Sequence, residues 1–112
     1  MPKIELQDFV KYGKLFEIYG ELLSDDRQKI MTDYFQFNMT LAEIAKEREI
    51  SRQAVLDAID KSCKKLKIYE QKLNVLKNQE ELKLKLEEVK LLAQKELLAE
   101  IEEKVERILK GI

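Results

Sequence analysis

The sequence predicts an all-α protein, made of a helix-turn-helix bundle and a long C-terminal helical arm. Apolar residues recur at helical spacing along nearly all of the 112 residues. The chain has one proline, at position 2, and only three glycines, so few residues interrupt a helix. Two helix-start signals stand close together near the middle of the chain. We expect a helix-turn-helix domain over residues 1–78, with the motif itself at 40–66, and a self-associating arm over residues 79–112.

The first helix is expected from about Leu6 to Leu23. Aromatic and aliphatic residues at steps of three or four form one stripe along it, namely Phe9, Tyr12, Phe16, Tyr19 and Leu23. Such a stripe is more often buried between helices than exposed for stacking on bases. Gly13 and Gly20 lie beside it. Because a glycine lowers helix propensity by about 1 kcal/mol, these two indicate that another helix packs closely there.

A second helix is expected over residues 25–37, capped by Ser24. Asp25 and Asp26 stand in its first turn, at the positive end of the helix dipole. Its inner face should hold the apolar residues Ile30, Met31, Tyr34, Phe35 and Phe37. Asn38 follows, and asparagine is one of the few residues that readily end a helix in the left-handed conformation.

Residues 40–66 carry the helix-turn-helix signal. Thr40 and Glu43 have the spacing of a capping box, and Ser51 can cap the next helix. Apolar residues stand where a hydrophobic staple would cover each cap, namely Met39 with Ile44 and Ile50 with Val55. Two short helices joined by a turn of three or four residues form a binding motif rather than a catalytic one.

One helix is then expected from residue 52 to about 77, because nothing breaks the helical pattern after Ser51 and Asn78 is the only local weak point. Its apolar stripe alternates steps of four and three: Val55, Ile59, Ser62, Leu66, Tyr69, Leu73 and Leu76. A final helix of about 30 residues, roughly 45 Å long at 1.5 Å per residue, follows. One face of it carries Leu82, Leu86, Val89, Ala93, Leu97, Ile101, Val105 and Ile108.

That last helix is longer than the core of a small domain can cover. We therefore expect its apolar face to pair with a second copy of the chain. The alternative is a bend near residues 93–97 that folds the end back onto its own domain.

The motif also resembles known families. The run AEIAKEREISRQAV resembles the helix-turn-helix of region 4 in bacterial sigma factors. The wider pattern is similar to the YlxM family of small bacterial proteins over roughly residues 9–90, through LLSDDRQ at 22–28, DYF at 33–35, SRQAVLDAIDK at 51–61 and LKIYEQKLNVL at 66–76. The resemblance implies a sigma-region-4-like fold and a regulatory role linked to the signal recognition particle pathway.

The second helix of such a motif lies in the major groove of DNA. The candidate nucleic-acid-binding residues are therefore Ser51, Arg52, Gln53, Lys61, Lys64 and Lys65. Arg52 can pair with guanine or a phosphate, and Gln53 with adenine. The resemblance implies DNA contacts at these two positions. The lysines would neutralise phosphates.

Acidic residues oppose this interpretation. Asp57 and Asp60 project from the same helix face, and Glu47 and Glu49 make the turn acidic. Sigma-type motifs usually carry glycine at the position of Glu49. The net charge is −1 over 21 basic and 22 acidic residues, and only residues 40–72 are positive, with eight basic and six acidic side chains. The lysine cluster is alternatively a solvated helix face.

Enzymatic and membrane functions are not expected. Histidine is absent, which removes the usual zinc sites and His-dependent nucleophiles, and no Gly-rich loop accompanies the carboxylates. We expect no cofactor and no bound metal. Cys63 is alone, which excludes an intramolecular disulfide and fits the reducing cytoplasm. No apolar run approaches the roughly 20 residues that insert in a membrane, and no export signal begins the chain.

Two functions remain open. The first is a regulatory helix-turn-helix protein of the signal recognition particle pathway that binds DNA or RNA, including the particle's own RNA. The second is a protein-interaction module that contacts signal recognition particle proteins without binding nucleic acid. A homodimer is expected in either case.

Overall fold

The structure, a computed structural model, describes residues 6–111, and its regular elements are all helices. These are α1 (Leu6–Tyr19), the 3-10 helix η1 (Gly20–Leu22), α2 (Asp25–Phe35), α3 (Leu41–Arg48), α4 (Arg52–Leu73) and α5 (Val75–Lys110). The described residues contain no strand, so the all-α prediction is confirmed. They divide into two compact units, one that ends at Leu76 and one that begins at Lys77.

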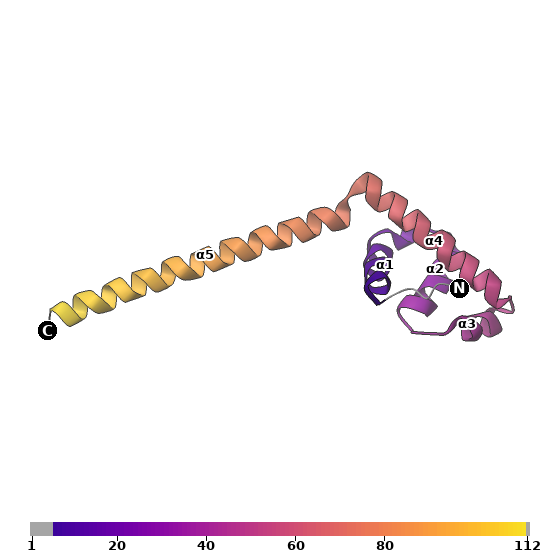
Figure 1. The fold of residues 1–112 in the computed structure, drawn as a ribbon, viewed down its shortest axis with the longest axis horizontal. Helices are drawn as coiled ribbons and strands as arrows, with labels where there is room; N and C mark the ends of the chain where they lie inside the picture. The colour runs from indigo at the N-terminus through magenta and orange to yellow at the C-terminus, as the bar shows by residue number, and fades with distance from the viewer. Residues whose placement is uncertain (1–5, 112) are drawn as a thin grey trace. The chain divides into compact units, whose positions relative to one another are not determined.

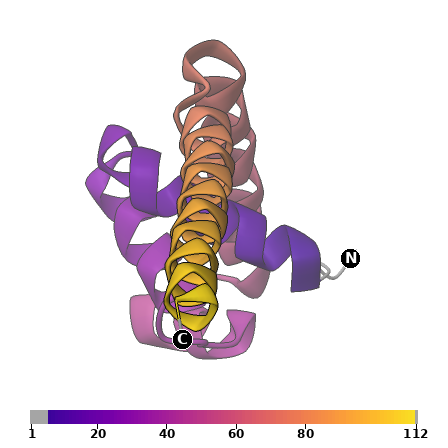
Figure 2. The ribbon, with the colours of Figure 1, turned by 90° about the vertical axis from the view of Figure 1, so that its left-hand side faces the viewer.

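The first unit is built around α4, which contacts α1, α2 and α3. Figure 1 shows the three shorter helices on one side of α4, and Figure 2 shows α1 running across the direction of α4. One core lies between them: Leu15, Phe16, Tyr19, Leu23, Ile30, Met31, Ile44, Ala45, Val55, Ile59, Cys63 and Leu66. The aromatic stripe of the first helix is therefore core, as predicted, and Leu15 joins it. Phe9 packs at the edge, with its ring centroid 4.8 Å from that of Phe35.

The predicted first helix is shorter than expected. α1 ends at Tyr19, one 3-10 turn follows, and Leu23 is extended so that Ser24 can begin α2. A Cβ at Gly20 would lie 2.8 Å from the ring of Phe16. The close neighbour at Gly20 is thus a side chain of α1 itself, and the expected approach of another helix is wrong at this position.

The second helix ends at Phe35, two residues before the predicted end. Phe37 lies beyond the last helical turn, outside the inner face, and is 67% exposed, so its placement in the core was wrong. Asn38 has a left-handed φ of 52°, which confirms its predicted role at this helix end.

The break between α4 and α5 falls at Asn74, whereas we predicted it at Asn78. Asn74 has a left-handed φ of 53° and donates its N–H to the carbonyl of Glu70 at 2.8 Å. Two side chains from the first unit satisfy N–H groups at the start of α5. The Tyr19 hydroxyl accepts from the Val75 N–H at 3.2 Å, and Glu70 Oε1 accepts from the Leu76 N–H at 3.1 Å.

The second unit is the part of α5 from Lys77 onward. All of its described side chains are exposed, including its large aliphatic ones. α5 is uninterrupted through residues 93–97, so the alternative of a bend there is wrong. Within the described part of the chain, no helix is both long and apolar enough to span a membrane.

Candidate nucleic-acid interface

The first helix of the motif, α3, begins with the predicted capping box. The Thr40 hydroxyl accepts from the Glu43 N–H at 3.1 Å, and Glu43 Oε1 accepts from the Thr40 N–H at 3.3 Å. Ile44, one turn on, is fully buried, and Met39 packs against the same core. Local hydrogen bonds therefore start α3 where the sequence predicted, and core contacts anchor it.

The turn between α3 and α4 uses a glutamate where glycine is usual. Glu49 has a left-handed φ of 57°, and the Ile50 N–H donates to the carbonyl of Ala45 at 3.1 Å. This is the pattern of a Schellman motif. Ser51 then caps α4, because its hydroxyl accepts from the Ala54 N–H at 3.0 Å. The turn has the helix-ending geometry that glycine normally provides, although Glu49 has a Cβ.

An ion pair that the sequence analysis did not identify joins α3 to α2. Arg48 Nη2 donates to Asp33 Oδ2 at 2.7 Å, and the two side chains are 27% and 13% exposed. A small cavity of about 250 Å³ beside it is lined by Gln28, Lys29, Thr32, Asp33 and Arg48. Because Arg48 is the last residue of α3, the pair holds the helix end that leads into the turn.

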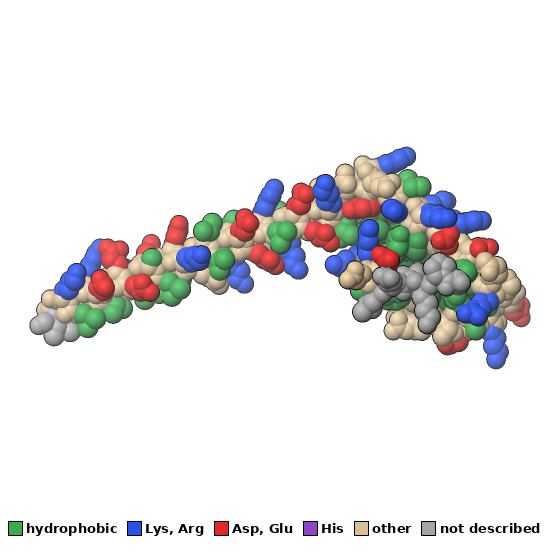
Figure 3. All heavy atoms as spheres, in the orientation of Figure 1, with side chains coloured by type: hydrophobic (Ala, Val, Ile, Leu, Met, Phe, Trp, Pro, Cys, Tyr) green, Lys and Arg blue, Asp and Glu red, His purple; other side chains and the backbone are tan. Residues whose placement is uncertain are grey.

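The structure places all the predicted nucleic-acid-binding residues at the start of α4 or on its exposed side: Ser51, Arg52, Gln53, Lys61, Lys64 and Lys65. Figure 3 shows lysine and arginine side chains gathered along the outer edge of the first unit, over α4. The opposite side of α4 carries Val55, Ile59 and Leu66 into the core. The helix phase derived from the sequence is therefore correct.

The two aspartates on this face have partners on α4 itself. The Gln53 amide nitrogen donates to Asp57 Oδ1 at 3.0 Å, and Lys64 pairs with Asp60 at 3.1 Å. Each contact spans four residues, which brings the two side chains together on a helix surface. Two of the six candidate residues are thus engaged by the aspartates that were expected to oppose binding.

The remaining basic candidates are free of such pairing. No carboxylate of the described residues forms an ion pair with Arg52, Lys61 or Lys65. Between residues 61 and 72 the only acidic residue is Glu70, and the same stretch has five lysines. Glu70 is half-buried, and its Oε1 accepts a hydrogen bond from the Tyr19 hydroxyl at 2.7 Å. The fully exposed charged side chains of this stretch are therefore all lysines.

Cys63 lies beneath this surface and has no features of a reactive thiol. Its side chain is buried, and burial, with a smaller contribution from nearby Asp60, raises the pKa of the thiol to about 12. The thiolate is the reactive form of cysteine, and almost none is present near neutral pH. Burial also raises the pKa of Tyr12 and of Tyr34. Both tyrosines pack against the core that holds Cys63.

A capped helix, a left-handed turn and a second capped helix, packed on two further helices, define a helix-turn-helix protein. The chain belongs to the UPF0122 family, whose model, "Putative helix-turn-helix protein, YlxM / p13 like", matches residues 6–108. This confirms the resemblance to the YlxM family.

Several bacterial relatives carry the same family name. The UPF0122 protein of Fusobacterium nucleatum is 38% identical, over 70% of this chain and 82% of its own length. That of Caldanaerobacter subterraneus is 36% identical, over 74% and 71%, respectively. That of Lactococcus lactis subsp. cremoris strain MG1363 is 40% identical, over 67% and 68%.

Proposed function

We propose that this protein is a non-enzymatic regulatory helix-turn-helix protein that binds nucleic acid through α4 and acts in the cytoplasmic signal recognition particle pathway. One observation carries the proposal. The exposed side of α4 from residue 61 to residue 72 presents lysines, while its single acidic residue, Glu70, is engaged by Tyr19. A surface of this kind binds phosphates through counterion release.

Contacts to the nucleic-acid backbone should dominate over base readout. Gln53, the residue best suited to adenine, is held by Asp57, and Lys64 is held by Asp60. Arg52, Lys61 and Lys65 are the charges available for phosphates. Since phosphate contacts position a protein without reading sequence, we expect weak sequence preference. Weak sequence preference is compatible with a structured RNA as the ligand, such as that of the signal recognition particle, as well as with duplex DNA.

A second candidate function is a protein-interaction module of the same pathway without nucleic-acid binding. Its supporting observation is that Asp57 and Asp60 lie in the first half of α4, where a helix in the major groove approaches the bases. Two carboxylates there disfavour DNA and would suit a basic protein surface.

Binding by the full-length chain, measured by fluorescence anisotropy, separates the two. Signal recognition particle RNA, an unrelated structured RNA and duplex DNA serve as probes over a series of salt concentrations. We expect Lys61→Ala/Lys64→Ala/Lys65→Ala to weaken binding at least tenfold. The salt slope should fall by roughly two, because each phosphate contact contributes about 0.7–0.9.

The matched control replaces three exposed lysines of the same unit outside α4, as Lys11→Ala/Lys14→Ala/Lys29→Ala. It should change affinity less than threefold. Equal losses in the two triple variants would mean that α4 is not the binding surface. No binding to any probe at low salt, with signal recognition particle proteins still retained from nuclease-treated lysate, would favour the second function.

A further inference from the structure

The exposed apolar stripe of α5 has a spacing suited to a right-handed helix pair. Its eight residues run from Leu82 to Ile108, and each of the large aliphatic ones is about half exposed or more. Seven steps cover 26 residues, a mean of about 3.7 residues per step, close to the 3.67 of an 11-residue repeat. Leu86, Leu97 and Ile108 show that repeat directly. A left-handed coiled coil would need about 3.5 residues per step.

The stripe is also nearly symmetric about residue 95. Counted outward from that point, Ala93 mirrors Leu97, Val89 mirrors Ile101 and Leu82 mirrors Ile108. Leu86 falls one residue from the mirror position of Val105. A stripe that reads almost alike in both directions matches a copy of itself that runs the opposite way. The small Ala93 then faces the larger Leu97, which is the alternation that close packing favours.

The distribution of charge along α5 also favours an antiparallel pair. Residues 83–95 carry four lysines and two glutamates, whereas residues 96–106 carry five glutamates and one lysine. An antiparallel pair sets the positive segment of each copy against the negative segment of the other. A parallel pair would set like charge against like charge in both segments, which costs affinity and selects against that arrangement.

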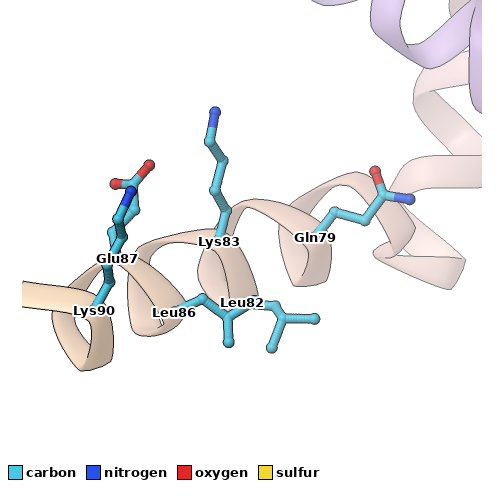
Figure 4. A pocket seen from close by; sticks show the side chains of 6 residues that line it. All are labelled: Gln79, Leu82, Lys83, Leu86, Glu87 and Lys90. Atoms are coloured by element: carbon cyan, nitrogen blue, oxygen red, sulfur yellow. The ribbon is translucent and has the colours of Figure 1, made fainter. Parts of the chain in front are cut away.

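In an antiparallel pair, the C-terminal end of the second copy's α5 would lie beside Leu82, where the helix surface has a depression. Gln79, Leu82, Lys83, Leu86, Glu87 and Lys90 line a shallow depression on this helix that is open to solvent. Figure 4 shows Leu82 and Leu86 on the same side of the helix, away from the Lys83 ammonium group. When the two copies are related by the symmetry about residue 95, Val105 and Ile108 of the second copy lie against Leu82 and Leu86.

We propose that α5 pairs with α5 of a second copy of this chain in an antiparallel arrangement whose two-fold axis passes near residue 95. The pairing does not depend on nucleic-acid binding by α4. The two Lys77 residues of such a pair lie roughly 54 Å apart along the helix direction, at 1.5 Å per residue.

Cysteine cross-linking of the full-length chain tests both the pairing and its direction. In Leu82→Cys/Ile108→Cys the two thiols of one chain are roughly 39 Å apart along α5, too far to join within a chain. Mild oxidation should give a covalent dimer in which peptide mapping finds residue 82 joined to residue 108. Leu82→Cys alone should remain largely uncross-linked. Ala99→Cys, on the opposite side of the helix, is the matched control and should not cross-link.

Disulfides joining 82 to 82 and 108 to 108 would overturn the antiparallel direction. Cys63 is buried, so its native thiol does not interfere. Sedimentation equilibrium gives the second readout, with an expected mass of twice 13.3 kDa. Ile101→Asp should weaken the dimer at least tenfold while leaving the circular dichroism of the helices unchanged. A wild-type chain that stays monomeric at high micromolar concentration would overturn the pairing.

Discussion

Tyr19 and Glu70 are 51 residues apart in the sequence, yet the Tyr19 hydroxyl donates to Glu70 Oε1 at 2.7 Å. The same hydroxyl accepts the Val75 N–H, and the same carboxylate oxygen accepts the Leu76 N–H. Burial, reinforced by the hydrogen bond to Glu70, raises the pKa of Tyr19, so the phenol remains a donor through neutral pH. The pair closes the end of the core and caps the first turn of α5.

Replacing Tyr19 with phenylalanine should destabilise the first unit. The variant keeps the ring but removes the hydroxyl that donates to Glu70 and that accepts the Val75 N–H. We expect a loss of about 1–3 kcal/mol in the free energy of unfolding, measured by urea denaturation. Tyr12→Phe is the matched control, since the Tyr12 hydroxyl makes no hydrogen bond with the described residues, and should cost well under that. Equal losses would mean that the network contributes nothing of its own.

Alkaline pH should destabilise the fold through Cys63. Burial raises the pKa of this thiol from 9.0 to about 12. Because the folded pKa lies above the unfolded one, the stability contribution is complete below pH 9 and is lost as the pH rises towards 12. Tyr12, Tyr19 and Tyr34 act in the same direction at higher pH, since each has a raised pKa.

Urea midpoints measured between pH 8 and pH 11 check this expectation. The wild-type midpoint should fall more steeply with pH than that of Cys63→Ala, whatever the difference at pH 8. Parallel pH profiles for the two proteins would show that the thiol loses its proton equally readily in the folded and the unfolded chain, which would contradict the raised pKa.

Neutralising the aspartates of α4 should raise nucleic-acid affinity. Asp57→Asn/Asp60→Asn removes two negative charges and frees Lys64 from its ion pair. We expect severalfold tighter binding to duplex DNA and RNA. The salt slope should become steeper by about 0.7–0.9 if the freed Lys64 reaches a phosphate. Glu80→Gln/Glu81→Gln makes the same charge change on α5 and should leave affinity nearly unchanged. Lower affinity in the α4 variant would instead indicate that an aspartate makes a base contact.

Removing the arm should leave the first unit folded. The core residues all lie at or before Leu66, and the contacts to Val75 and Leu76 survive truncation after Glu81. Chemical denaturation of the truncated chain should therefore remain cooperative. Its sedimentation mass should be that of a monomer, whereas we expect the full chain to sediment as a dimer. A truncated chain that still dimerises would place the dimer contact in the first unit.

The sequence alone predicted those features that depend on residues within about one helical turn. Thr40 and Glu43 are three residues apart, as are Ser51 and Ala54, and both caps form as predicted. The spacing of apolar residues predicted which side of α4 faces the core. Asp57 and Asp60 lie on the opposite, exposed side, as that prediction requires. Such features are readable because the hydrogen bonds and the helical period are local.

Only the tertiary structure decided which asparagine ends α4 and which polar groups remain available on its surface. Asn74 and Asn78 are equivalent as local helix terminators, but Tyr19 and Glu70 stabilise a helix start directly after Asn74. Likewise, Arg48 meets Asp33 across two helices, and Glu70 is withdrawn from the lysine surface by Tyr19. These partners lie 15 and 51 residues apart, and only the packing of the helices against one core brings them together.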